Sequence, residues 1–155
     1  MNEKITEIKE GQRLKIFDLE FEIIEKIGSG GFGDVWSLKN TKNGNKVVMK
    51  CQNSDTDKKT MITTRTKDEL YHRFIQEAET FIELEHHTNI AYFYGIEKIA
   101  NRIAIIMEFV SGRSLDQWLD KAKINEWNKI LTIAIQICKA LAHSHSYGII
   151  QRFKT

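Results

Sequence analysis

Apolar and polar residues alternate along three early stretches of the chain, and alternation of this kind predicts half-buried strands. In residues 21–27 the apolar positions 21, 23 and 27 fall on one face, with an interruption near Ile24. Residues 35–39 and 46–50 are rich in β-forming side chains, and an Asn-Gly turn signal separates them. The pattern therefore predicts three consecutive antiparallel strands.

The stretch from residue 66 to residue 82 has the periodicity of a helix. The sequence Thr66-Lys67-Asp68-Glu69 has the T-x-x-E form of a capping box, which predicts that a helix begins there. Apolar residues then recur at spacings of three or four, as expected for a helix with one buried face. These residues are Leu70, Phe74, Ala78 and Phe81, with Ile75 and Ile82 widening the stripe.

Further elements complete the pattern. Residues 91–96 and 102–107 predict two more strands, separated by a polar turn at 97–101. Near the N-terminus an apolar patch predicts a short extra strand beside the first one; it consists of Leu14, Ile16, Phe17 and Leu19. After a short helix from Ser114 to about residue 122, a longer helix is expected over 125–146, with Gly148 as its stop.

Length and composition narrow the functional classes. A chain of 155 residues with 23 basic and 21 acidic side chains predicts one domain without the basic surface of a nucleic-acid or membrane-binding protein. The N-terminus lacks the pattern of a signal peptide, and the apolar run at 130–138 is too short to span a bilayer. Free thiols are expected at Cys51 and Cys138, and a cytoplasmic location is expected.

No metal site is predicted. Neighbouring histidines in a turn, such as His86 and His87, cannot easily face one ion. Of His143 and His145, we expect one in the core and one in solvent.

Three glycines, Gly28, Gly30 and Gly33, have the spacing G-x-G-x-x-G. Glycine lets backbone N–H groups approach a charged ligand closely, which suits a phosphate. The same spacing opens the dinucleotide-binding fold, but there the last glycine leads from a strand into a helix. Here strands are predicted on both sides, so the glycines join two antiparallel strands.

With the valine at 35, this loop resembles the G-x-G-x-x-G-x-V loop of eukaryotic-type protein kinases of the serine/threonine type, and Val47-Val48-Met49-Lys50 resembles their V-A-I-K strand. The resemblance implies an α+β fold: a kinase-like small lobe, with a five-stranded antiparallel sheet and one helix, followed by two helices of an incomplete large lobe. It implies an N-terminal extension at 1–20, small lobe and hinge at 21–110, and the beginning of the large lobe at 111–155.

The resemblance also implies that Lys50 and Glu77 are catalytic residues, with Glu77 holding the lysine. Alternatively, Glu77 is one of several surface acids, since other glutamates follow it. The apolar stripe places position 77 beside 74 and 81, which favours the pairing.

ATP is the cofactor that the resemblance implies. Met107-Glu108-Phe109-Val110 resembles the kinase hinge, with Met107 beside the adenine and the main chain of Glu108 and Val110 bonding to it. The full set of expected ATP-binding residues is Ile27, Gly28, Ser29, Gly30, Gly31, Phe32, Gly33, Val35, Val48, Lys50, Met107, Glu108 and Val110.

The chain departs from the family at its end. Where H-R-D is expected it has Gln151-Arg152-Phe153, and no D-F-G follows, so the protein ligands for the family's Mg²⁺ are absent. We therefore expect the ATP-binding portion of a serine/threonine kinase, truncated before catalysis and without phosphate transfer by this chain alone; whether it is an enzyme stays open. The alternatives are a non-catalytic, pseudokinase-like binding module and one half of a split kinase. A protein partner or completing chain is expected to cover the helix at 125–146.

Overall fold

The computed structural model describes residues 7–30, 33–52, 67–100, 102–119 and 127–150. Contacts divide the chain into two compact units. The first comprises residues 1–82 and 93–109, and the second comprises residues 83–92 and 110–155.

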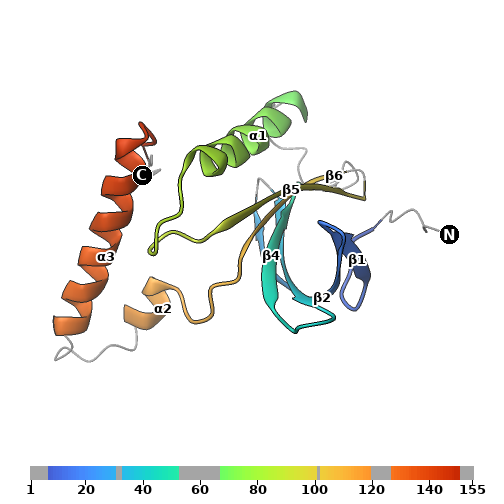
Figure 1. The fold of residues 1–155 in the computed structure, drawn as a ribbon, viewed down its shortest axis with the longest axis horizontal. Helices are drawn as coiled ribbons and strands as arrows, with labels where there is room; N and C mark the ends of the chain where they lie inside the picture. Colours follow the sequence, from blue (N-terminus) through green and yellow to red (C-terminus); the bar gives the residue numbers. More distant parts are fainter. Residues whose placement is uncertain (1–6, 31–32, 53–66, 101, 120–126, 151–155) are drawn as a thin grey trace. The chain divides into compact units, whose positions relative to one another are not determined.

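The first unit is built on one antiparallel sheet with the strand order β1-β2-β3-β4-β6-β5 (Figure 1). Its strands are β1 (Arg13–Ile16), β2 (Leu19–Gly30), β3 (Gly33–Asn40), β4 (Lys46–Cys51), β5 (Phe93–Ile99) and β6 (Arg102–Glu108). The five expected strands are confirmed, and β1 is the short extra strand that was expected beside β2. The sheet and the helices together confirm the α+β class.

The apolar patch before β2 is only half buried. Leu14 and Ile16 point into the core, whereas Phe17 and Leu19 are exposed. Phe17 and Asp18 have φ values of 48° and 63°, the left-handed conformation of a tight two-residue hairpin turn. Leu14 and Ile16 therefore pack as predicted, and the tight turn leaves Phe17 on the surface.

Strand β2 does not keep its alternation to the end. Register shifts against β3 occur between Ile23 and Glu25 and between Lys26 and Gly28, so Ile24 and Ile27 have no partner in the β3 register. The first shift lies where the sequence pattern is interrupted. Because a bulge changes which face the following side chains occupy, Ile27 is 46% exposed and does not share the buried face of Phe21 and Ile23. The prediction of one face for all three was wrong.

Strand β5 continues to Ile99, past residue 96, where the strand predicted from the sequence ends. Residues 97–99, expected in a turn, continue the pairing with β6, and Ile99 is buried. Charged side chains are compatible with this strand because they alternate with inward positions.

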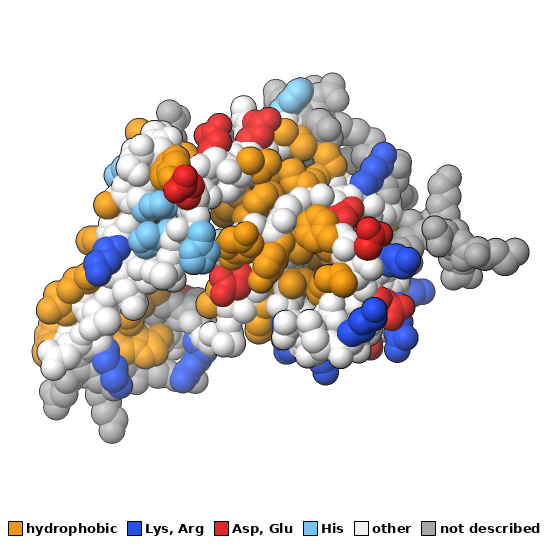
Figure 2. Space-filling model, in the orientation of Figure 1, with side chains coloured by type: hydrophobic (Ala, Val, Ile, Leu, Met, Phe, Trp, Pro, Cys, Tyr) orange, Lys and Arg blue, Asp and Glu red, His pale blue; other side chains and the backbone are white. Residues whose placement is uncertain are grey.

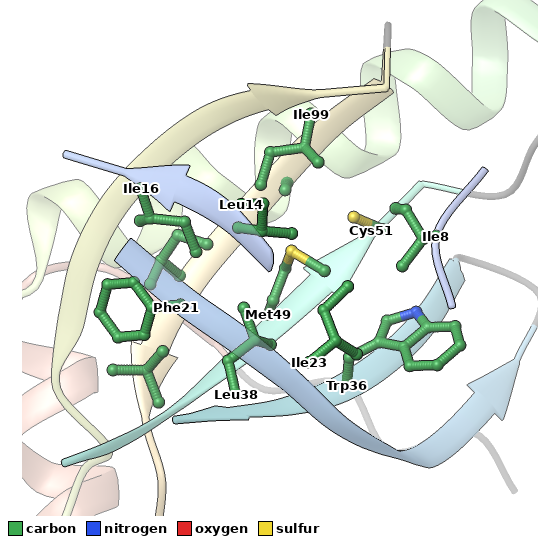
Figure 3. Packing of buried hydrophobic residues seen from close by; sticks show 13 residues of the cluster. Ile8, Leu14, Ile16, Phe21, Ile23, Trp36, Leu38, Met49, Cys51 and Ile99 are labelled. Carbon is green, nitrogen blue, oxygen red and sulfur yellow. The ribbon is translucent and has the colours of Figure 1, made fainter. Parts of the chain in front are cut away.

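The main core fills the concave side of the sheet (Figure 3). It contains alternate residues of the central strands, such as Trp36 and Leu38 from β3 and Met49 and Cys51 from β4. On the other face, Phe74 and Ala78 of α1 pack with Ile105. Strand β6 is thus covered on both sides, by the main core at Ala104 and Ile106 and by α1 at Ile105, which explains its apolar run at 103–107.

Helix α1 (Lys67–Glu83) confirms the predicted helix, although its proposed cap, Thr66, lies outside the described residues. Among the α1 side chains that the structure describes, Phe74 and Ala78, four residues apart, are buried, and Phe81 stacks on Phe93 with ring centroids 5.9 Å apart. Ile82, expected to widen the stripe, is 61% exposed.

The second unit contains α2 (Leu115–Leu119) and α3 (Trp127–Ser146). After α3, Gly148 has a φ of 72°, its N–H bonds to the His145 carbonyl, and the Ile149 N–H bonds to the Ser144 carbonyl. This pair of bonds is the Schellman motif, so the helix stop predicted at Gly148 is confirmed. Among the described helices, none is both long and apolar enough to cross a membrane.

We predict that Gly33→Ala is strongly destabilising. A Cβ at this position, whose φ is 145°, would lie 2.0 Å from the Cys51 carbonyl oxygen. Because the obstacle is backbone, the β3–β4 contact has to open, at a cost of about 3 kcal/mol or more in the free energy of unfolding. Urea denaturation measures this cost.

Gly30→Ala is the matched control, because a Cβ there meets nothing within 4 Å. Its expected cost is about 1 kcal/mol or less. Equal stability of the two variants would contradict the close strand approach.

Candidate functional site

The sheet register brings several predicted site residues onto one face. Val35 of β3 lies opposite Lys50 of β4, and Lys50 lies opposite Ile105 of β6. Val48, two residues from Lys50, pairs with Met107. Directly paired residues share a face, and it is the face that α1 covers at Ile105. The site therefore lies on the opposite side of the sheet from the main core.

Lys50 and Glu77 form an ion pair on this face. The Lys50 ammonium nitrogen Nζ lies 2.5 Å from Oε1 and 2.6 Å from Oε2 of Glu77. Their side chains are 19% and 32% exposed, so the pair is partly shielded from water. The pairing expected from the sequence is present, while the catalytic role of the two residues stays a prediction.

The position of Glu77 follows from the packing of α1. Phe74 and Ala78 anchor the helix, and Glu77 is adjacent to both on the helix surface, at spacings of three and one. Apolar anchoring therefore aims the carboxylate at β4, and the interpretation of Glu77 as a plain surface acid was wrong.

The glycines lie in the β2–β3 hairpin. Gly28 is opposite Val35, Ser29 is opposite Asp34, and Gly30 is opposite Gly33. The hairpin that was predicted between two strands is confirmed. Gly31 and Phe32, both expected at the nucleotide, lie outside the described residues.

A cluster that the sequence analysis did not single out lies across this hairpin. Asp34 Oδ1 accepts a hydrogen bond of 2.8 Å from the Ser29 hydroxyl and is 2.6 Å from Lys26 Nζ. Burial alone raises the pKa of the Asp34 carboxyl, but hydrogen bonds from Lys26 and Ser29 outweigh that effect and lower the pKa below its usual value. The cross-strand register would have revealed the cluster, but two bulges hide that register in the sequence.

The remaining predicted residues divide between the two units. Met107 and Glu108 end β6 in the first unit, whereas Val110 belongs to the second and is largely exposed. Ile27 is exposed on β2.

The histidines form ring contacts within the second unit. His87 and His143 stack with centroids 4.8 Å apart, and His143 Nε2 lies 3.0 Å from the Glu85 carbonyl oxygen. His143 is partly buried and His145 is exposed. Among the described residues, no group of three or more potential ligands could hold a metal ion.

Comparison with known proteins agrees with this geometry. The family model described as the protein kinase domain matches residues 21–152. The serine/threonine-protein kinase SSK22 of Saccharomyces cerevisiae is 31% identical over 126 residues, which cover 81% of this chain and 9% of the yeast protein. The probable serine/threonine-protein kinase PknB of Lactococcus lactis is 30% identical over 139 residues, which cover 89% of this chain and 21% of the Lactococcus protein.

A solved structure shares the fold. The PknI kinase domain of Mycobacterium tuberculosis matches with a TM-score of 0.61 and 18% identity, over 87% of this chain and 51% of that one. The chain thus spans about half of that solved domain and at most about a fifth of the two sequence relatives.

We predict that the two cysteines differ sharply in reactivity. Burial raises the pKa of the Cys51 thiol to about 12, whereas Cys138 is exposed on α3. Since the thiolate is the reactive form, iodoacetamide at pH 8 should alkylate Cys138 and leave Cys51 unmodified, as measured by peptide mass spectrometry.

Urea should abolish the difference, because unfolding exposes Cys51. Equal alkylation of both thiols without urea would contradict the buried position of Cys51.

Proposed function

The chain belongs to the protein kinase domain family, and from that membership we propose that it is the ATP-binding portion of a serine/threonine-type protein kinase. The observation that carries the proposal is the ion pair between Lys50 and Glu77. A lysine held by a carboxylate at the end of a sheet strand can meet the negative charge of a triphosphate.

The arrangement around Lys50 supports a nucleotide. Val35 and Val48 supply apolar surface on the same face, and the Gly28–Val35 pair brings the glycine hairpin into the same row as Lys50. An apolar wall beside one cation suits a ligand with a flat base and a charged tail.

We propose that the adenine lies at the end of β6. Met107 borders this region by its pairing with Val48. The main-chain carbonyl of Glu108, at the end of β6, is able to accept a hydrogen bond from a purine. Val48 is larger than the alanine of V-A-I-K and narrows this part of the site.

The described residues fit a bound Mg²⁺ less well than they fit ATP. In the kinase family the metal neutralises phosphate charge and is held by an aspartate and an asparagine. Within the described ranges no three acidic or other ligand side chains gather, and the residues at 151–155 lie outside them. Phosphate transfer to protein hydroxyls is proposed for the larger kinase, since these 155 residues contain no D-F-G sequence.

We predict that ATP raises the melting temperature of the wild-type chain and that Lys50→Met removes most of this shift. The substitution keeps the length of the side chain but deletes the charge that meets the phosphates. We expect ATP affinity to fall about tenfold or more, as for loss of a hydrogen-bonded charge pair. Thermal-shift titration and calorimetry measure both quantities.

Lys39→Met is the matched control. Lys39 also lies on the sheet but is exposed, at the opposite end of β3 from the glycine hairpin. It should bind ATP like the wild type. A wild-type chain that shows no ATP-dependent shift would overturn the proposed function, and so would equal binding by Lys50→Met.

A second proposal concerns α3. None of its residues is buried, and hydrophobic side chains lie along the helix in Figure 2. The exposed large apolar residues of α3 include Trp127, Leu131, Ile135 and Ile137. Trp127 and Leu131 are 68% and 61% exposed. We propose that further large-lobe polypeptide covers this helix, which agrees with the 51% coverage of the solved kinase domain.

We predict that a polypeptide of these 155 residues alone self-associates. Each large apolar side chain gains about 1.5–3 kcal/mol when it is fully buried, so the exposed face favours contact between copies. Size-exclusion chromatography with light scattering should show species larger than a monomer, and Leu131→Gln with Ile135→Gln should reduce them. A stable wild-type monomer would contradict the proposal.

A further inference from the structure

The two arms of the glycine hairpin have few side chains with which to hold one another. Gly28, Gly30 and Gly33 contribute none, so the backbone ladder lacks the cross-strand contacts that normally stabilise a β-ribbon. Ser29 and Asp34, directly opposite each other, are the polar pair between them. Among the described residues of the hairpin, Asp34 is therefore well placed to control the spacing of the arms through its contacts with β2.

Asp34 contacts Lys26 as well as Ser29, the residue directly opposite it. Its Oδ1 accepts the Ser29 hydroxyl at 2.8 Å and the Lys26 ammonium at 2.6 Å, so one oxygen joins two positions of β2. The carboxylate side chain is 16% exposed, which shields these bonds from competing water.

The contact is anchored to the core. Lys26 Nζ lies 5.8 Å from the centre of the Trp36 ring, and Trp36 is buried in the main cluster. An ammonium over an indole face is attracted to it. The chain of contacts Trp36, Lys26, Asp34 and Ser29 thus runs from the packed core to the glycine hairpin.

We propose that Asp34 is a positioning residue for the triphosphate, because it fixes Ser29 and Lys26 and so sets the spacing of the described arms of the glycine hairpin, 26–30 and 33–35, before ATP arrives. The inference rests on the proposed ATP binding. Ordering a flexible segment in advance removes an entropy cost from binding. Asp34 acts through the hairpin and not by contact with the nucleotide.

The negative charge of Asp34 also has a direct effect on ATP affinity, which is opposite to the effect of positioning. A carboxylate near a triphosphate repels it, so removing the charge of Asp34 would by itself strengthen ATP binding. Lys26 offsets that charge in the structure. Neutral substitution at Asp34 therefore distinguishes the two effects, since positioning predicts weaker binding and repulsion predicts tighter binding.

The experiment measures dissociation constants for ATP and for adenosine by calorimetry in wild type, Asp34→Asn and Asp34→Glu. We expect Asp34→Asn to weaken ATP about five- to tenfold, the loss typical of a charge-assisted hydrogen bond. Adenosine, which has no phosphates, should bind within about twofold of wild type, and Asp34→Glu should restore part of the ATP affinity because the carboxylate is kept.

A second variant does not alter charge. Ser29→Ala should weaken ATP about two- to threefold in the wild-type background and add nothing in the Asp34→Asn background, because the bond is already lost. The matched control is Glu20→Gln at the other end of β2, where a carboxylate also accepts a hydroxyl, Thr41 Oγ1 at 3.0 Å, and lies 3.9 Å from an arginine, Arg13. It should leave ATP affinity unchanged.

Each result supports or overturns the inference. Unchanged or tighter ATP binding by Asp34→Asn overturns it while wild-type binding upholds the proposed function. An equal loss for ATP and adenosine, with a lower melting temperature, overturns it in favour of a purely structural role. If the wild type binds no ATP, both the proposed function and this inference fail.

Discussion

Lys50 carries a positive charge on a sheet face whose neighbouring positions are apolar, and Glu77 is the carboxylate that meets it. A partly buried ammonium without such a partner loses hydration that nothing replaces. The pairing depends in turn on Phe74 and Ala78, which fix the side of α1 that faces the sheet. The neutralisation of Lys50 therefore depends on the packing of α1, and a change in the position of this helix alters the charge on the face that is proposed to bind ATP.

Strand β4 serves the core and the site with alternate residues. Met49 and Cys51 enter the main core, while Val48 and Lys50 belong to the other face. A shift of the strand by one residue would exchange these sets and place the lysine in the core. The pairing of β4 with β3 on one side and β6 on the other excludes that shift. The packing of Met49 and Cys51 in the core therefore also fixes the position of Lys50 on the same strand.

Sequence patterns predicted the strands and the helices because these depend on local periodicity, whereas the Lys50–Glu77 pair was expected from the resemblance to protein kinases, with support from the apolar stripe of the helix. The face of Ile27 was predicted incorrectly, since β2 contains two register shifts and the sequence pattern marks only the first, near Ile24. Strand β5 was predicted too short, because paired charged residues look like a turn when their partner strand is unknown. The Asp34 contacts were missed for a related reason: they depend on cross-strand register, which local patterns do not specify.

The turn at Phe17 links two strands that are far apart in the order of the sheet. The Phe17 N–H donates to the Glu97 side chain of β5 at 2.9 Å, and its ring lies so close to Gly95 that a Cβ there would be 2.8 Å from it. Strands β1 and β5 are the two margins of the sheet. Unpaired edge strands can form hydrogen bonds with strands of other chains, and this pairing can lead to fibrils. Contacts between the two edges therefore leave the folded sheet less open to pairing with another chain.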